Sequence, residues 1–158
     1  TMKIGKSVSI NYNRRKLDCR YYSIWNGIPI FITTGTNNVH SVILKDYSCL
    51  ISVDMDIMQM YNRGMIDAAL WHEVSHLYHK DCMLPWDIEY EYRADAVGAV
   101  ATSIELIVDS LNISKRLYRN KVALSIIDTR IENILENGYD ICEHPMDMLE
   151  SIKPAVVV

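Results

Sequence analysis

The sequence predicts an α+β fold in a single domain, with strands first and helices after them. Residues 7–53 contain short apolar runs separated by turn residues, which is typical of an antiparallel sheet. Residues 55–136 instead space their apolar positions by three and four, as helices do. Strands followed by helices favour a sheet with the helices packed on one face. The 158 residues, 49% of them hydrophobic, suffice for one domain with a sizeable core.

The strand region contains one clear hairpin, over residues 19–33. Asn26-Gly27 separates two runs rich in β-branched and aromatic residues, and this dipeptide suits the positive φ angles of a type I′ turn. Two further strands are expected at 39–45 and 48–53, on either side of Asp46-Tyr47.

The helical region divides into one short and three long segments. The expected helices cover residues 55–61, 65–80, 87–111 and 114–136. Residues 1–6 and 154–158 show no periodic pattern, and we expect them to be loose termini of the single domain 1–158.

The segment His72-Glu73-Val74-Ser75-His76 is the main functional signal. It reads H-E-x-x-H inside the expected helix 65–80, so His72 and His76 lie one turn apart on the same face. Two imidazoles at this spacing can bind one zinc ion, and Glu73 can take a proton from a water that the metal activates. The plain alternative is a helix that carries a pair of histidines by chance.

A second motif, in the next expected helix, contains a candidate third ligand. Glu91 and Asp95 lie one turn apart in the next helix, and the small residues Ala94 and Gly98 would let that helix approach the first one closely. A carboxylate ligand leaves the fourth zinc position open for water. Asp95 could accept the other ring N–H of a histidine ligand. The alternative is that these acidic residues lie at the solvent-exposed start of a helix, where acids are favoured. That accounts well for Asp87 and Glu89 but less well for Asp95.

Together, H-E-x-x-H and the following E-x-x-A-D resemble the gluzincin metallopeptidases over residues 40–105. The short gap between the motifs is most similar to that of ImmA/IrrE-like peptidases and minigluzincins. The resemblance implies a zincin-like fold in which an N-terminal antiparallel sheet precedes the metal-binding helix and two further helices. It also implies Zn²⁺ bound by His72, His76 and Glu91, with Glu73 as general base. Asp95 would accept a hydrogen bond from the ring N–H of one histidine ligand.

The resemblance therefore implies a zinc metallopeptidase that hydrolyses peptide bonds. An extended substrate would add to an edge strand, here 39–44 or 48–53. Tyr139 and His144 are candidate donors to the oxyanion.

The alternative to a peptidase is a non-catalytic zincin-fold module whose zinc is structural or regulatory. A structural site prefers four protein ligands, so binding by His79 or Cys82 would favour it. The presence of Glu73 argues against a structural zinc site, which needs no base. A third possibility is another kind of zinc hydrolase, which would use the same ligands. His40, on a strand, is expected to serve packing.

Composition limits the partners. The net charge of −4 and the pI near 5.7 do not favour nucleic acid or a membrane surface. The sequence shows neither a signal peptide nor a transmembrane run, and its four cysteines form no C-x-x-C pair. We therefore expect a cytoplasmic protein with reduced thiols, whose partner is a protein or peptide substrate. The sequence leaves the oligomeric state open.

Overall fold

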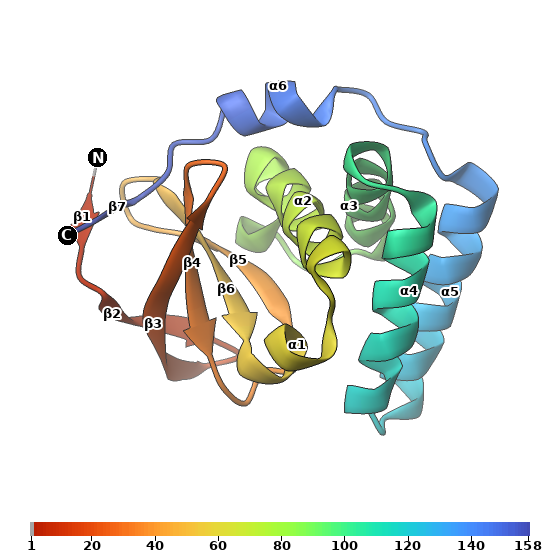
Figure 1. Ribbon diagram of the computed structural model, residues 1–158, viewed down its shortest axis with the longest axis horizontal. Helices are drawn as coiled ribbons and strands as arrows, with labels where there is room; N and C mark the ends of the chain where they lie inside the picture. Colours follow the sequence, from red (N-terminus) through yellow and green to blue (C-terminus); the bar gives the residue numbers. More distant parts are fainter. Residues whose placement is uncertain (1) are drawn as a thin grey trace.

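The structure, a computed structural model, describes residues 2–158 and shows a mixed α+β fold with a curled sheet beside several helices (Figure 1). The strands are β1 (Lys3–Ile4), β2 (Ser7–Tyr12), β3 (Arg15–Trp25), β4 (Ile28–Thr33), β5 (Val39–Ile43), β6 (Cys49–Asp54) and β7 (Val156–Val157). The helices are α1 (Met55–Met60), α2 (Arg63–His79), α3 (Ile88–Ala101), α4 (Ile104–Ser114), α5 (Lys121–Asn137) and α6 (Pro145–Glu150). Two 3₁₀ turns, η1 (Asp81–Met83) and η2 (Lys115–Leu117), follow α2 and α4.

The main sheet has the strand order β2-β3-β4-β6-β5. The hairpin between β3 and β4 is confirmed, because Asn26 and Gly27 have φ angles of 48° and 83°. The expectation of a purely antiparallel sheet is wrong at one place, since β4 pairs with β6 in parallel. The chain passes from β4 to the edge strand β5 and returns by a hairpin, which inserts β6 between β4 and β5.

Helix α2 occupies the centre of the molecule, between the sheet and helices α3, α4 and α5 (Figure 1). Its residues Leu70, Val74 and Leu77 pack in one core cluster with Ile51 and Val53 of β6. All six residues of β6 are buried, which is typical of a strand covered on both faces. Because the other side of α2 meets α3 and α4, polar groups on that side are also buried.

The single helix expected over residues 87–111 is in fact two helices. The chain turns at Thr102, whose φ and ψ are −126° and −93°, and Ser103 caps α4 by accepting a hydrogen bond from the Leu106 amide. A serine hydroxyl at this position competes with continuation of the helix. The close approach of α3 to α2 is confirmed, because a Cβ on Gly98 would lie 2.9 Å from the Ala68 carbonyl oxygen.

The termini are ordered in the described residues, contrary to the expectation of loose ends at 2–6 and 154–158. β1 and β7 pair in parallel, and the buried Ala155 donates its amide to the Cys49 carbonyl oxygen. The two ends lie beside each other in Figure 1. A short periodic pattern cannot reveal such pairing, since each strand has only two residues.

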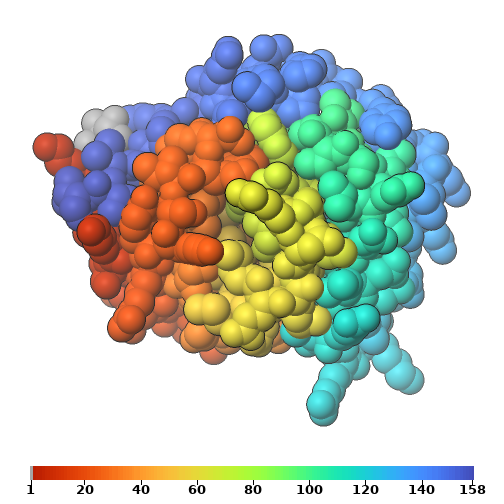
Figure 2. Space-filling view, in the orientation of Figure 1, coloured from red at the N-terminus to blue at the C-terminus, as the bar shows by residue number. Residues whose placement is uncertain are grey.

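Figure 2 shows the face on which the sheet, α1 and α4 lie side by side, with α6 across the top. Among residues 2–158, no helix has both the length and the apolar character needed to cross a membrane.

Candidate metal centre

Helix α2 places His72, Glu73 and His76 on one buried surface. The Asn62 side chain caps the start of the helix, and Lys80, with a left-handed φ of 56°, ends it directly after the motif. All three side chains belong to buried residues. One ligand atom from each lies within 4.8 Å of the others, so this His-Glu-His group could hold a metal ion.

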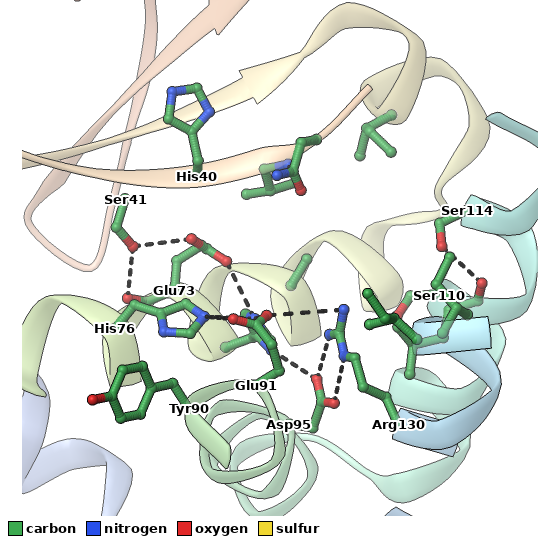
Figure 3. Close-up of a pocket in the computed structure, with 18 of the residues that line it drawn as sticks. His40, Ser41, Glu73, His76, Tyr90, Glu91, Asp95, Ser110, Ser114 and Arg130 are labelled. Carbon is green, nitrogen blue, oxygen red and sulfur yellow. Dashed lines mark hydrogen bonds and ion pairs between the residues drawn. The ribbon is translucent and has the colours of Figure 1, made fainter. Parts of the chain in front are cut away.

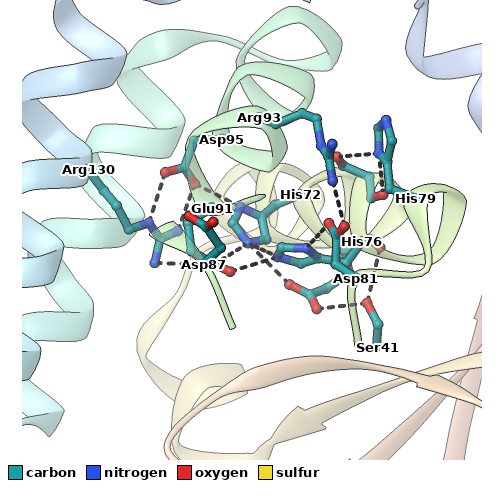
Figure 4. Close-up of polar contacts among 12 residues, drawn as sticks. Ser41, His72, His76, His79, Asp81, Asp87, Glu91, Arg93, Asp95 and Arg130 are labelled. Carbon is teal, nitrogen blue, oxygen red and sulfur yellow. Dashed lines mark hydrogen bonds and ion pairs between the residues drawn. The ribbon is translucent and has the colours of Figure 1, made fainter. Parts of the chain in front are cut away.

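Glu91 of α3 reaches the same point from the opposite helix. Its Oε1 lies 3.3 Å from His72 Nε2 and its Oε2 lies 3.3 Å from His76 Nε2. The two Nε2 atoms are 3.0 Å apart. Figure 4 shows how the two imidazoles and the carboxylate converge.

An aspartate holds the other nitrogen of each imidazole. His72 Nδ1 donates to Asp95 Oδ1 at 2.8 Å, and His76 Nδ1 donates to Asp81 Oδ2 at 2.9 Å. With the ring proton on Nδ1, the lone pair of each Nε2 is directed at the shared point. The sequence predicts Asp95 in this position but not Asp81, which follows the end of α2.

A guanidinium group in turn holds each aspartate (Figure 4). Arg130 of α5 donates to both oxygens of Asp95, from Nε at 2.9 Å and from Nη2 at 2.7 Å. Arg93 of α3 donates to Asp81. Two parallel His–Asp–Arg chains therefore fix the orientation of the imidazoles, and sequence reasoning misses both arginines.

The charges of the site suit a divalent cation. The site contains four carboxylates, those of Glu73, Asp81, Glu91 and Asp95, and two guanidinium groups, which leaves two negative charges when every carboxylate is ionised and the imidazoles are neutral. Without a cation, two protons on the imidazoles would compensate these charges. Burial lowers the pKa of His76, but hydrogen bonds to Asp81 and Glu91 outweigh it and raise the pKa to about 10. A bound cation would therefore displace protons.

The two oxygens of the Glu73 carboxylate have different neighbours. Ser41 of β5 donates its hydroxyl to Oε1 at 2.9 Å, and Oε2 lies 3.5 Å from His72 Nε2. Burial raises the pKa of Glu73, and this effect exceeds the opposing effect of His76 and His72. A buried carboxylate with a raised pKa is suited to accept a proton.

A cavity of about 450 Å³ lies over the cluster (Figure 3). Residues 39–41 of β5 form one wall, helices α4 and α5 close one end, and Leu84, Trp86 and Tyr90 form part of the rim. β5 is the sheet edge, whereas β6 is interior, so of the two expected edge strands only β5 borders the site as an edge.

At the end of the cavity near α4, three hydroxyl groups already donate hydrogen bonds within the protein. The Tyr61 hydroxyl donates to the Ser110 carbonyl oxygen at 2.9 Å, and the hydroxyls of Ser110 and Ser114 donate within their own helix. Ile107, Leu111 and other apolar residues complete this end. An apolar group would therefore be buried favourably against these side chains.

Three residues considered for the site lie elsewhere. Tyr139 is 62% exposed, and His144 caps α6 by accepting a hydrogen bond from the Met146 amide. His79 donates from Nδ1 to the Ser75 carbonyl oxygen at 2.9 Å. None of the three lines the cavity within the described residues, whereas Tyr90 and Arg130 do.

The cysteines are free thiols throughout the described part of the chain. Cys82 is exposed and lines the cavity close to Asp81.

His40 lies on the other side of β5 from Ser41 (Figure 3). Its ring packs on Tyr12, with 4.8 Å between the centroids, and neither ring nitrogen has a hydrogen-bond partner. Burial lowers the pKa of His40 from 6.5 to about 4. This imidazole is thus neutral in the folded chain at neutral pH, as expected for a packing role.

We predict that His40 makes the fold acid-sensitive. Below pH 6.5 the unfolded chain takes up a proton at His40, but the folded chain does so only near pH 4. Its contribution is therefore intact above pH 6.5 and is lost as the pH falls towards 4, by at most about 3 kcal/mol. Urea denaturation between pH 7 and 4 should show a steeper loss for wild type than for His40→Phe. Parallel curves for the two proteins would contradict this prediction.

No protein family model, no curated protein and no solved structure matches this chain.

Proposed function

We propose that this chain is a zinc metallopeptidase with a zincin-like fold of the gluzincin type. The observation that carries the proposal is the convergence of two imidazole Nε2 atoms and the Glu91 carboxylate, beside the buried Glu73. The E-x-x-A-D motif and the order of sheet and helices agree with the resemblance drawn from the sequence.

The distances among the donor atoms support zinc. Ligands about 2.0–2.1 Å from a tetrahedral ion lie roughly 3.3 Å from one another. The two Nε2 atoms are 3.0 Å apart, and each lies 3.3 Å from a different oxygen of Glu91, His72 Nε2 from Oε1 and His76 Nε2 from Oε2. Two nitrogens and one carboxylate oxygen are a ligand set that zinc prefers in hydrolases. Glu91 rather than Glu73 would be the third ligand, because Glu91 contacts both imidazoles.

In the proposed reaction, zinc would lower the pKa of a water molecule and polarise the substrate carbonyl. Glu73 would accept the proton of the attacking water at Oε2, since Oε1 is engaged by Ser41. Glu73 would then pass that proton to the leaving amine. Arg130 and Tyr90, which line the cavity, are candidates for contact with substrate oxygens.

Substrate would bind as an extended peptide along β5. This strand is an edge of the sheet and lines the cavity next to Glu73, so it could pair with an added strand. An apolar side chain of the substrate would fit the end of the cavity at Ile107 and Leu111.

The alternative, a module with a structural metal, has less support. A structural zinc site usually takes four protein ligands. Of the two candidate fourth ligands, His79 is directed at the Ser75 carbonyl oxygen and does not line the cavity. Cys82 does line it, so this alternative depends on that thiol.

Elemental analysis of the purified chain tests the proposal first. We expect about one zinc per chain in wild type, and loss of that zinc in His76→Ala and Glu91→Ala. His79→Ala is the matched control and should keep it. Chelation should also stop cleavage of a mixed peptide library, and zinc should restore it. Wild-type protein that binds no zinc at neutral pH would refute the proposal.

A further inference from the structure

Ser41 links the edge strand β5 to Glu73. Its side chain is directed from β5 towards α2, and Figure 3 shows it facing Glu73. The hydroxyl is 2.9 Å from Glu73 Oε1 and 3.1 Å from the Glu73 carbonyl oxygen. Ser41 is 9% exposed, and Ile51 of β6 pairs with it in the sheet. The hydroxyl therefore comes from a part of the fold that is held in place by the sheet.

The Glu73 carboxylate could take either of two roles. Its oxygens are close enough to His72 and His76 to serve with them as a metal ligand. A second protein oxygen on the metal, in addition to that of Glu91, would fill the position that a catalytic site leaves to water. A general base must instead stay next to the metal without binding it. To act as a base, Glu73 therefore needs a contact elsewhere in the fold that restrains its carboxylate.

We propose that Ser41 is a positioning residue that keeps Glu73 as a base by holding its Oε1 away from the metal. The hydrogen bond fixes Oε1 towards the sheet, so only Oε2 is directed at the cluster, 3.5 Å from His72 Nε2. A glutamate side chain has three rotatable bonds, and an anchored oxygen removes most of that freedom. This inference rests on the proposed function, but it also predicts a property of the metal site that does not require turnover.

The test compares Ser41→Thr with Ser41→Val. Both side chains are β-branched, suit a strand and have the same shape, but only threonine keeps the hydroxyl. We expect one zinc per chain in both proteins. We expect the Val protein to have a kcat about 10–100-fold below that of the Thr protein, with little change in KM.

A second measurement is independent of activity. After replacement of the metal by Co²⁺, the Thr protein should have the visible absorption spectrum of wild type. The spectrum of the Val protein should differ, because the released Glu73 carboxylate can turn Oε1 to the metal. Should the Val protein fail to fold, Ser41→Ala against wild type makes the same comparison.

The two measurements separate this inference from the proposed function. Equal kcat values for the Thr and Val proteins would overturn the role of Ser41. If wild type cleaves no peptide, the peptidase proposal falls and the Co²⁺ spectra decide the role of Ser41. Spectra that differ would then support it, and identical spectra would overturn it.

Discussion

Replacing Glu73 by glutamine is expected to lower kcat by about 10²–10⁴-fold while zinc content stays at the wild-type level. Glutamine has the size of glutamate and can still accept the Ser41 hydrogen bond at Oε1, so the side chain should remain in place. It cannot accept a proton from water at neutral pH. The proposed metal ligands His72, His76 and Glu91 are untouched. Peptide cleavage and elemental analysis on the same preparation measure both effects.

The control for this substitution is Glu89→Gln, which removes an exposed carboxylate of α3 at no cost to the site. It should leave kcat and zinc content unchanged. Cleavage by Glu73→Gln at the wild-type rate would show that Glu73 is not the base. Loss of zinc together with activity would show instead that Glu73 is a metal ligand, which the distances within the His-Glu-His group also permit.

Those elements that local sequence encodes were predictable. The positive φ angles of Asn26 and Gly27 follow from the residue types, as does the pairing of β3 with β4. Spacing by four residues places His72 and His76 together, because helix geometry alone determines it. The close packing of α3 on α2 follows from the small residues Ala94 and Gly98.

Features that depend on contacts distant in the chain were not predictable. The parallel pairing of β4 with β6 depends on where the hairpin of β5 and β6 docks. The pairing of β1 with β7 joins residues from opposite ends of the chain. The break between α3 and α4 had a local signal in Ser103, but the apolar pattern continues through it.

In the site, the residues that hold the imidazoles from behind were harder to predict than the cluster of His72, His76 and Glu91 itself. Asp81 is brought back to His76 by the left-handed turn at Lys80, which no helical spacing describes. Arg130 comes from a helix 35 residues beyond Asp95. A signal for Arg130 does exist, since it lies on the same face of α5 as the buried Ile127 and Ile134. A charged residue on a buried face needs a buried partner.

Removal of Arg130 should therefore be costly. We expect Arg130→Met to lower the free energy of unfolding by about 3–5 kcal/mol, because it leaves Asp95 without its bidentate partner in a nearly dry position. Asp95 has 1% of its side chain exposed. Burial alone would raise the pKa of Asp95, but Arg130 outweighs it and holds the pKa below its usual value. Urea denaturation of the metal-free protein at pH 7 measures the loss.

Arg93→Met is the matched comparison, because Arg93 holds Asp81 behind His76 as Arg130 holds Asp95 behind His72. The Arg93 side chain is 37% exposed, against 17% for Arg130, so water can replace much of its interaction. We expect Arg93→Met to cost about 1 kcal/mol or less. Equal losses in the two variants would mean that burial does not set the strength of these two Arg–Asp contacts. A larger loss in Arg130→Met would show that the more deeply buried contact, between Arg130 and Asp95, contributes more to the stability of the fold.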